Sequence, residues 1–227
     1  MNLLAIDAAG SVLSVAVSRD RDYYYDQTEA GMKHSELVME IINRQMEKAE
    51  MKPSDLNGIL CMGGPGSFTG LRIGFSIAKG LALSLNIPFV PVPTLECIAY
   101  SAIGLSLPVI QARKDAYFYS FFNDGRRITE DCDGTISQIT EAIKKFTREN
   151  EKINITGPAA AEVYGTLPSE LKSLCMYSCN SLGYAVELIK LAKNKDLFYT
   201  DNTAFLYSGP EYIRKTDAEI NLNHNKN

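Results

Sequence analysis

Residues 63–83 read GGPGSFTGLRIGFSIAKGLAL, and this stretch decides how the chain folds. Residues four apart stack along one face of an α-helix, so a helix over 67–85 would carry a strip almost without side chains. The segment GILCM before it, residues 58–62, predicts a short buried strand. This order suits either a phosphate cradle or close packing against another helix. The small residues recur every four positions, at Gly66, Gly70, Gly74, Ala78 and Ala82.

The phosphate interpretation rests on free N–H groups and the helix dipole at the start of that helix. The specific nucleotide-loop patterns are missing, because the stretch contains neither GxxxxGK[ST] nor GxGxxG, and Pro65 removes one amide donor. A carboxylate that closes a first strand, as Asp7 does, can equally cap a turn. The anion-loop candidates are Asp7, Gly64, Gly66 and Ser67.

The packing interpretation is favoured over phosphate binding. Each interior glycine costs a helix about 1 kcal/mol relative to alanine, and close approach of another backbone is the usual compensation. A helix this apolar does not lie on a solvated surface, so either a core surrounds it or a partner chain covers one side. A second amphipathic helix, predicted over 34–50, would pack beside it. The other faces of the 67–85 helix carry Leu71, Ile73, Phe75, Ile77, Leu81, Leu83 and Leu85.

Composition narrows the classes of function. The 227 residues carry a net charge of −4 without a basic stripe, so the chain is not expected to grip nucleic acid alone. The start lacks a signal-peptide pattern, and no run of about 18 apolar residues occurs, so a cytoplasmic protein without a membrane span is expected. Five cysteines without CxxC spacing indicate reduced thiols, with a zinc site around Cys175 and Cys179 as the second alternative. Only His34 and His224 are histidines, which excludes a His-rich metal site.

The pattern of the whole chain suggests an internal duplication. The first half is predicted to run β-β-β-α-β-α and then a short strand, and the second half echoes this order. We expect an N-terminal subdomain over 1–103, a C-terminal subdomain over 104–214 and a fraying tail over 215–227. The predicted strands cover 3–7, 11–18, 22–27, 58–62, 89–92, 108–113, 115–122, 126–131 and 153–157, and the predicted helices cover 34–50, 67–85, 135–150 and 181–194.

Four segments resemble the TsaB family, also called YeaZ: LLAIDAAGSVLSVAV, KHSELVMEIINRQMEKA, GGPGSFTGLRIGFSIAKGLALSLNIPFVPVPTLECIA and PEYIRK. The resemblance covers most of residues 1–100, and GPGSFTGLRIG is highly specific to this family and its TsaD-type relatives. It implies an α/β fold of the actin/Hsp70-like (ASKHA), ribonuclease H-like class, built from two related β-β-β-α-β-α subdomains. One departure concerns Asp7, which is followed by Ala8-Ala9-Gly10 where the family commonly has Thr-Ser-Thr.

The resemblance also implies a function. A TsaB-like chain would be a non-catalytic partner that forms a heterodimer with TsaD, with the TsaE-type ATPase joining. TsaD then makes threonylcarbamoyladenosine beside the anticodon of ANN-decoding tRNAs, so this chain would meet tRNA only through the complex. No cofactor or metal is expected, and ATP or ADP would bind the isolated chain weakly or not at all. TsaD-type enzymes carry HxxxH on the helix that matches 34–50, and here Val38 replaces the second histidine of that motif, after His34.

The two helices are expected to meet TsaD, and to pair with a second copy when TsaD is absent. Arg72 would reach an anion or a partner carboxylate, or would pair with Glu36 and Glu40. Gly74→Leu or Ile77→Asp is expected to abolish heterodimerisation. Two alternatives stay open: an autonomous nucleotide-binding switch, and a metalloprotease-like or kinase-like enzyme of the actin-like fold. The expected interface residues are His34, Leu37, Ile41, Gly70, Arg72, Ile73, Gly74 and Ile77.

Overall fold

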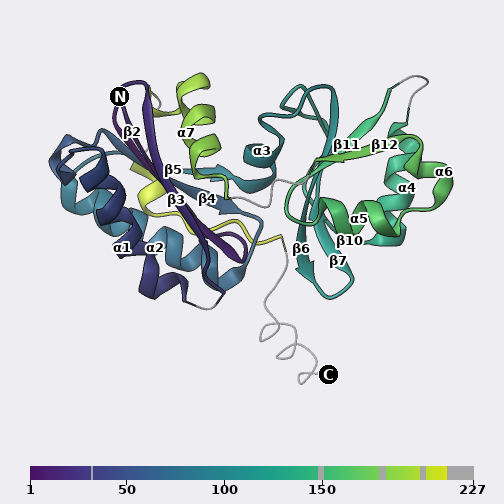
Figure 1. Ribbon diagram of the computed structural model, residues 1–227, viewed down its shortest axis with the longest axis horizontal. Helices are drawn as coiled ribbons and strands as arrows, with labels where there is room; N and C mark the ends of the chain where they lie inside the picture. Colours follow the sequence, from purple (N-terminus) through teal and green to yellow (C-terminus); the bar gives the residue numbers. More distant parts are fainter. Residues whose placement is uncertain (32, 148–150, 179–182, 200–202, 214–227) are drawn as a thin grey trace.

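The computed structural model describes residues 1–31, 33–147, 151–178, 183–199 and 203–213. Two halves lie side by side, each built on a twisted sheet with helices packed on it (Figure 1). The architecture confirms the actin-like α/β fold expected from the sequence. Cys179, His224, residues 181–182 of the predicted last helix, residues 148–150 of the predicted fourth helix and the tail 215–227 lie outside the described residues.

The first sheet has the strand order β3-β2-β1-β4-β5. Its first three strands form the predicted antiparallel meander, and the last two run parallel to the first. Side chains alternate across β1: Leu3 and Ala5 enter one core cluster, whereas Leu4 and Ile6 enter another. Both faces of this sheet are therefore covered. The strands are β1 Leu3–Asp7, β2 Val12–Arg19, β3 Asp22–Glu29, β4 Gly58–Gly64 and β5 Phe89–Pro93.

The second sheet repeats this arrangement, with the order β10-β7-β6-β11-β12. Strands β6, β7 and β10 are antiparallel, and β11 and β12 run parallel to β6. The predicted duplication of β-β-β-α-β-α is thus present in the connectivity. A small hairpin of β8 and β9 pairs with the first two residues of β6. The strands are β6 Leu105–Arg113, β7 Ala116–Tyr119, β8 Phe122–Asn123, β9 Arg126–Arg127, β10 Cys132–Thr135, β11 Ile153–Thr156 and β12 Cys175–Ser178.

Helices cover both sheets, and two of them contact the half to which they do not belong by sequence. Helices α1 and α2 pack on one face of the first sheet, and α4, α5 and α6 pack on one face of the second. Helix α3 follows β5 and lies between the sheets, where it contacts β4 and β5 of the first sheet and β6 of the second. Helix α7 follows β12 but packs on β1 and β2 of the first sheet. The helices are α1 His34–Lys48, α2 Phe68–Leu85, α3 Thr94–Ala99, α4 Ile136–Phe146, α5 Ala160–Thr166, α6 Ser169–Lys172 and α7 Ala185–Asn194.

The position of α7 differs from the expected grouping of 104–214 as one subdomain. Residues 185–194 belong to the second half by sequence, yet their apolar side chains share a core with strands of the first half. The physical reason is that the first sheet has a second apolar face, which α1 and α2 do not cover. Among the described residues, no helix combines the length and apolar character needed to cross a membrane.

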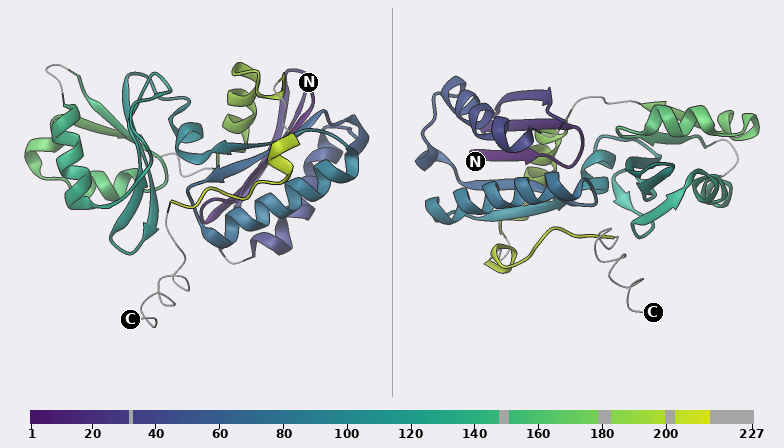
Figure 2. Two further views of the ribbon diagram at one scale, coloured as in Figure 1. Left: turned by 180° about the vertical axis from the view of Figure 1, so that it is seen from behind. Right: turned by 90° about the horizontal axis from the view of Figure 1, so that it is seen from below.

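Three short 3₁₀ helices complete the described structure. The first, Pro53–Asp55, lies between α1 and β4. The others, Leu197–Tyr199 and Thr203–Leu206, follow α7. After the last of these the chain runs as an extended segment beside α2, drawn in yellow in Figure 2. This segment brings residues from the end of the described chain back to the glycine-rich turn.

Candidate functional site

The glycine-rich turn joins β4 to α2 and is pressed against the first hairpin. Ser67 is the N-cap of α2, and its hydroxyl oxygen accepts a hydrogen bond from the Gly70 amide at 3.3 Å. The Ser67 amide itself donates to the carbonyl oxygen of Ala9 at 2.7 Å. A Cβ atom on Gly66 would stand 2.7 Å from that same oxygen. The turn therefore needs glycine in order to approach the hairpin backbone.

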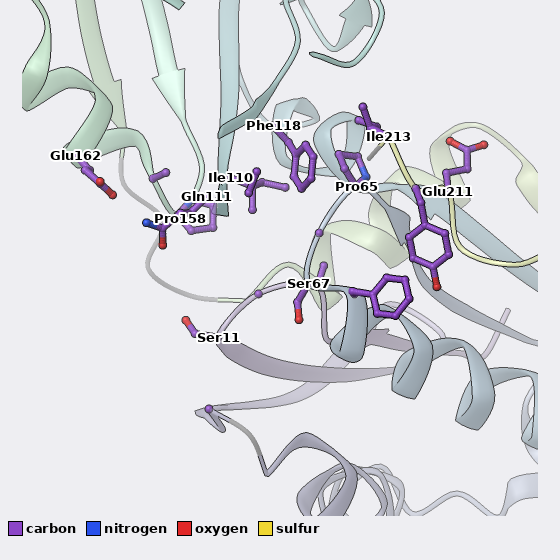
Figure 3. A pocket seen from close by; sticks show the side chains of 18 residues that line it. Ser11, Pro65, Ser67, Ile110, Gln111, Phe118, Pro158, Glu162, Glu211 and Ile213 are labelled. Atoms are coloured by element: carbon purple, nitrogen blue, oxygen red, sulfur yellow. The ribbon is translucent and has the colours of Figure 1, made fainter. Parts of the chain in front are cut away.

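A cavity of about 670 Å³ opens beside this turn, between the two halves. This volume lies within the range of small-molecule sites. Figure 3 shows Ile110 and Phe118 of the second half facing Pro65 and Ile213 across it. The cavity is lined by Ala9, Gly10, Ser11, Gly31, Pro65, Gly66, Ser67, Phe68, Ile110, Gln111, Ala112, Phe118, Pro158, Ala159, Glu162, Glu211, Tyr212 and Ile213.

The charge of the cavity wall does not suit a phosphate group. Within the described part of the chain, the charged lining residues are Glu162 and Glu211, and both are acidic. The Tyr117 hydroxyl donates to the Glu162 carboxylate at 2.7 Å, and burial together with this hydrogen bond raises the pKa of Tyr117 to about 12. Anion sites ordinarily offer cationic side chains or free amides. The charged side chains here are two carboxylates, which disfavour an anion.

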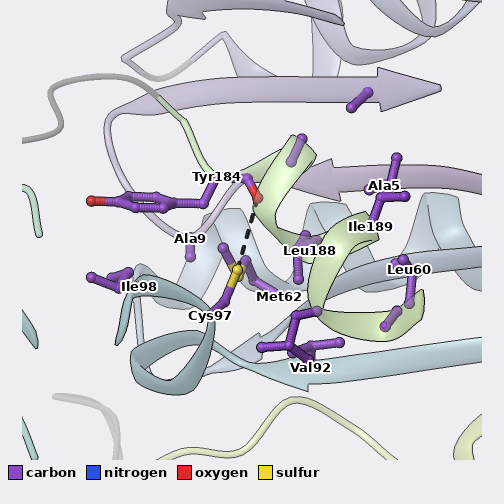
Figure 4. Close-up of a cluster of buried hydrophobic side chains, with 14 of the residues drawn as sticks. Ala5, Ala9, Leu60, Met62, Val92, Cys97, Ile98, Tyr184, Leu188 and Ile189 are labelled. Atoms are coloured by element: carbon purple, nitrogen blue, oxygen red, sulfur yellow. Dashed lines mark hydrogen bonds between the residues drawn. The ribbon is translucent and has the colours of Figure 1, made fainter. Parts of the chain in front are cut away.

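Asp7 is a buried link between the first strand and the last helix. Its side-chain oxygens accept hydrogen bonds from the Ala9 amide at 3.1 Å and the Tyr184 amide at 2.9 Å. Burial raises the pKa of Asp7, although these two hydrogen bonds act in the opposite direction. In Figure 4 the thiol of Cys97 on α3 lies beside the Tyr184 carbonyl, where it donates at 3.8 Å. Asp7 therefore holds the start of α7 in place.

The anion-loop candidates are brought together, and the polar groups of Asp7, Gly64 and Ser67 already have partners within the chain. Gly66 and Ser67 line the cavity, and Asp7 lines a smaller one next to it. The Gly64 amide donates to the Thr94 hydroxyl at 3.2 Å, and the Ser67 groups bond within the turn. The geometry gives the anion loop no support, and the loop stays a prediction.

The glycine strip of α2 faces its own sheet, which corrects the expectation that it meets a partner. A Cβ atom on Gly70 would stand 1.9 Å from the carbonyl oxygen of Ala8, and one on Gly74 would stand 3.8 Å from the Ala8 Cβ. Ala78 and Ala82 are also buried, among residues of the first sheet. The compensating close approach is thus made by the first hairpin of the same chain. Gly74→Leu would therefore damage the fold itself.

A different face of α2 is turned outward. We call it the outer face of α2: Thr69, Ile73, Ser76, Ile77, Gly80 and Leu83. Ile73 and Ile77 are half-buried, whereas the other four are exposed, with 62% of Leu83 accessible. The helix has two charged residues, Arg72 and Lys79, and neither lies on this face. A Cβ atom on Gly80 would meet nothing within 4 Å.

Helix α1 exposes fewer of the expected interface residues than predicted. His34 and Ile41 are 5% and 3% exposed and lie inside this chain, so neither is available to a partner in this conformation. Leu37 is half-buried beside α2, in the same apolar cluster as Ile73 and Ile77. The two helices do pack as a pair, as predicted. Across the described residues, no group of three or more His, Cys, Asp or Glu side chains could hold a metal ion.

Arg72 makes a contact that the sequence did not indicate. The expected pairing with Glu36 and Glu40 is wrong, because Arg72 donates from Nε to the Tyr212 hydroxyl at 3.1 Å. Its guanidinium carbon also lies 3.7 Å from the centre of the Phe68 ring. Glu40 instead pairs with Arg44, one turn along α1. Tyr212 belongs to the PEYIRK segment, and this resemblance was its signal in the sequence.

Comparison with solved structures supports the fold. A crystal structure described as an uncharacterized protein with similarity to peptidase YEAZ from Pseudomonas aeruginosa superposes with a TM-score of 0.79, at 19% identity, over 94% of this chain and 99% of that one. YeaZ from Pseudomonas aeruginosa gives a TM-score of 0.75 at 20% identity, over 93% and 99% of the two chains.

Curated relatives match part of the sequence. The tRNA threonylcarbamoyladenosine biosynthesis protein TsaB of Bacillus subtilis is 34% identical over 54% of this chain and 55% of its own length. The Escherichia coli protein of that name is 34% identical over 45% and 44%. The Buchnera aphidicola protein from Acyrthosiphon pisum is 30% identical over 66% and 68%. The chain spans about half the length of the first two relatives.

A family model describes most of the chain. The TsaD model, tRNA N6-adenosine threonylcarbamoyltransferase, matches residues 26–198, which is more than half of the sequence. The names of the curated relatives identify one branch within it, in agreement with the resemblance carried by the GPGSFTGLRIG turn. This chain therefore belongs to the TsaB (YeaZ) family of TsaD-type proteins.

Proposed function

We propose that this chain acts in the formation of threonylcarbamoyladenosine on tRNA, as a non-catalytic partner of a TsaD-type protein. The names of the curated relatives support a role in this pathway. A TsaE-type ATPase would join the pair, and tRNA would be held by the complex and not by this acidic chain alone. Such a role belongs in the cytoplasm, where tRNA is modified.

The observation that carries the partner role is the outer face of α2. Its exposed positions Thr69, Ser76, Gly80 and Leu83, together with Ile73, follow a spacing of four and three residues, which is the spacing of a helix–helix seam. The uncharged face and the absence of a side chain at Gly80 let another helix approach closely. We propose a TsaD-type helix as the occupant, and a second copy of this chain when TsaD is absent.

The test uses one substitution on this face and one matched substitution elsewhere. Gly80→Glu places a charge at the centre of the outer face, and Gly165→Glu places it on α5, where a Cβ atom also meets nothing within 4 Å. Gly80→Glu is expected to weaken binding to TsaD by about 100-fold or more, because an unpaired charge buried in an interface costs about 3 kcal/mol. Gly165→Glu should bind like the wild type, as measured by calorimetry.

Reconstitution of the tRNA modification separates the function from the surface. TsaD, TsaE and tRNA are assayed with the wild-type chain, with each variant and without the chain. If the modification proceeds equally well without the chain, the proposed function is wrong. If the chain is needed but Gly80→Glu supports full activity and binding, the function stands and the surface is wrong.

The isolated chain is proposed to bind ATP or ADP weakly or not at all. The cavity beside the glycine-rich turn is lined by two carboxylates, Glu162 and Glu211, and the Ser67 amide is already bonded to Ala9. Calorimetry with ATP, ADP and Mg²⁺ checks this, and tight binding would favour an autonomous nucleotide switch instead.

A further inference from the structure

Residues 205–213, which we call the C-terminal strap, close one side of the cavity. The strap starts from Phe205 and Leu206, which pack partly buried against the cores of the first half. It then runs along α2, where Lys79 Nζ donates to the carbonyl oxygen of Ser208. Its tip, residues 211–213, forms part of the cavity wall. Figure 2 shows this path beside α2.

The tip of the strap rests on the glycine-rich turn through its backbone. The Glu211 amide donates to the carbonyl oxygen of Gly63 at 2.8 Å. A Cβ atom on Gly64 would stand 2.3 Å from the carbonyl oxygen of Glu211, so no side chain fits between the two backbones. The missing side chain at Gly64 thus lets the turn contact an extended segment. This contact is separate from the turn's role at the start of α2.

The side chain of Tyr212 attaches the tip to α2. The ring of Tyr212 lies 4.8 Å from that of Phe68, and its hydroxyl accepts a hydrogen bond from Arg72 at 3.1 Å. Arg72 also stacks on Phe68, so three side chains form one cluster at the rim of the cavity. Such aromatic and cation–π contacts are modest when partly exposed. Tyr212 and Ile213 are 41% and 38% exposed, so little apolar burial adds to this attachment.

The two ends of the strap are held by different contacts: the root is Phe205 and Leu206, and the tip is residues 211–213. The root is anchored by apolar packing, whereas the described contacts of the tip are one backbone hydrogen bond and the Tyr212 cluster. Segments with few buried apolar contacts open at lower free energy than the core. Release of the tip would remove Glu211, Tyr212 and Ile213 from the cavity wall, opposite Ile110 and Phe118.

We propose that the C-terminal strap is a latch: its tip detaches from the glycine-rich turn without unfolding of the domain, and Tyr212 sets how often it does so. Detachment opens the cavity between the two halves. The proposal does not rest on the partner role, because the strap is held through Arg72 and Lys79, which border the outer face and are not part of it.

Amide hydrogen exchange by NMR tests the latch on the whole chain. In Tyr212→Ala the Glu211 amide is expected to exchange about ten-fold faster or more, while the Leu60 amide in the core strand β4 keeps its rate. Tyr212→Phe, which keeps the ring but loses the hydroxyl, should fall between. Tyr207→Ala is the matched control, because Tyr207 is on the same strap and is 92% exposed.

A second measurement reports on the cavity. Ile110 lines its wall and is 5% exposed, so a soluble paramagnetic probe should relax its methyl groups more strongly in Tyr212→Ala than in the wild type. The methyl groups of Ile155, fully buried in β11, serve as the reference. The proposal is overturned if Glu211 exchanges at the same rate in both proteins, if it exchanges in step with Leu60, or if Ile110 is unaffected.

Discussion

Gly70, in the first turn of α2, lies against the backbone of Ala8 in the first hairpin. A Cβ atom on Gly70 would stand 1.9 Å from the Ala8 carbonyl oxygen, whereas one on Gly74 would stand 3.8 Å from the Ala8 side chain. Two glycines on one helical face therefore have different roles, and only the first is required by backbone contact.

Gly70→Ala and Gly74→Ala are expected to have opposite effects on stability. The first forces apart two backbones that cannot repack, so the free energy of unfolding should fall by about 2–3 kcal/mol. The second makes an ordinary van der Waals contact and gains helix propensity, so stability should rise by up to about 1 kcal/mol. Urea denaturation compares the two. Equal losses in both variants would contradict this account of the strip.

Gly80→Ala should stabilise the isolated chain. Gly80 lies inside α2, is exposed, and offers open space to a methyl group. The expected gain is about 1 kcal/mol, the difference in helix propensity between the two residues. Thermal unfolding measures it. A loss of stability would mean that Gly80 already has a contact inside the chain, and the case for an outer docking face would weaken.

Gln45→Leu should also raise stability. Gln45 on α1 is fully buried, and neither its amide oxygen nor its amide nitrogen has a hydrogen-bond partner in the described structure. A buried polar group without a partner costs about 1–3 kcal/mol, so an apolar side chain of similar size should recover part of this. Asn43→Leu, on the exposed side of the same helix, should change stability by less than about 0.5 kcal/mol. Destabilisation by Gln45→Leu would show that the amide is bonded in solution.

Asp7 predicts a dependence of stability on pH. Burial raises its pKa in the folded chain above the ordinary value of 3.8, so the folded state binds this proton more tightly than the unfolded state does. Its contribution is fully present below pH 3.8 and is lost as the pH rises through the folded pKa. Relative to Asp7→Asn, the wild type should therefore lose stability over this window and then level off. A difference that stays constant with pH would contradict the raised pKa.

Much of the fold follows from local patterns. The meander, α1, α2 and the parallel strands β4, β5 and β11 were predicted within a few residues, because their apolar patterns are clear and their turns carry Gly, Asn, Asp or Pro. Helix α3 was missed, since it is short and apolar and lies directly after Pro93. Strand β12 was missed because Met176 and Tyr177 are exposed at a sheet edge and show no alternation.

The site could be predicted only in part, because the spacing of residues along a helix does not show whether a helical face packs on its own sheet or on a partner chain. Gly70 and Gly74 were assigned to a partner, yet a sheet of the same chain satisfies the same need for close approach. The better signal is the spacing of uncharged residues from Thr69 to Leu83, beside Arg72 and Lys79. The contact of Arg72 with Tyr212 joins residues 140 positions apart and has no local signature.

The packing of α7 on the first sheet has a consequence for biosynthesis. The strands of the first sheet leave the ribosome early, but the helix that shields their second face emerges only after nearly a hundred further residues have been translated. Until then the part of this apolar face that α7 covers is exposed to solvent, and a nascent chain in this state is vulnerable to aggregation. A stop codon placed before residue 185 should therefore yield an insoluble product, even though every strand of both sheets has already been made.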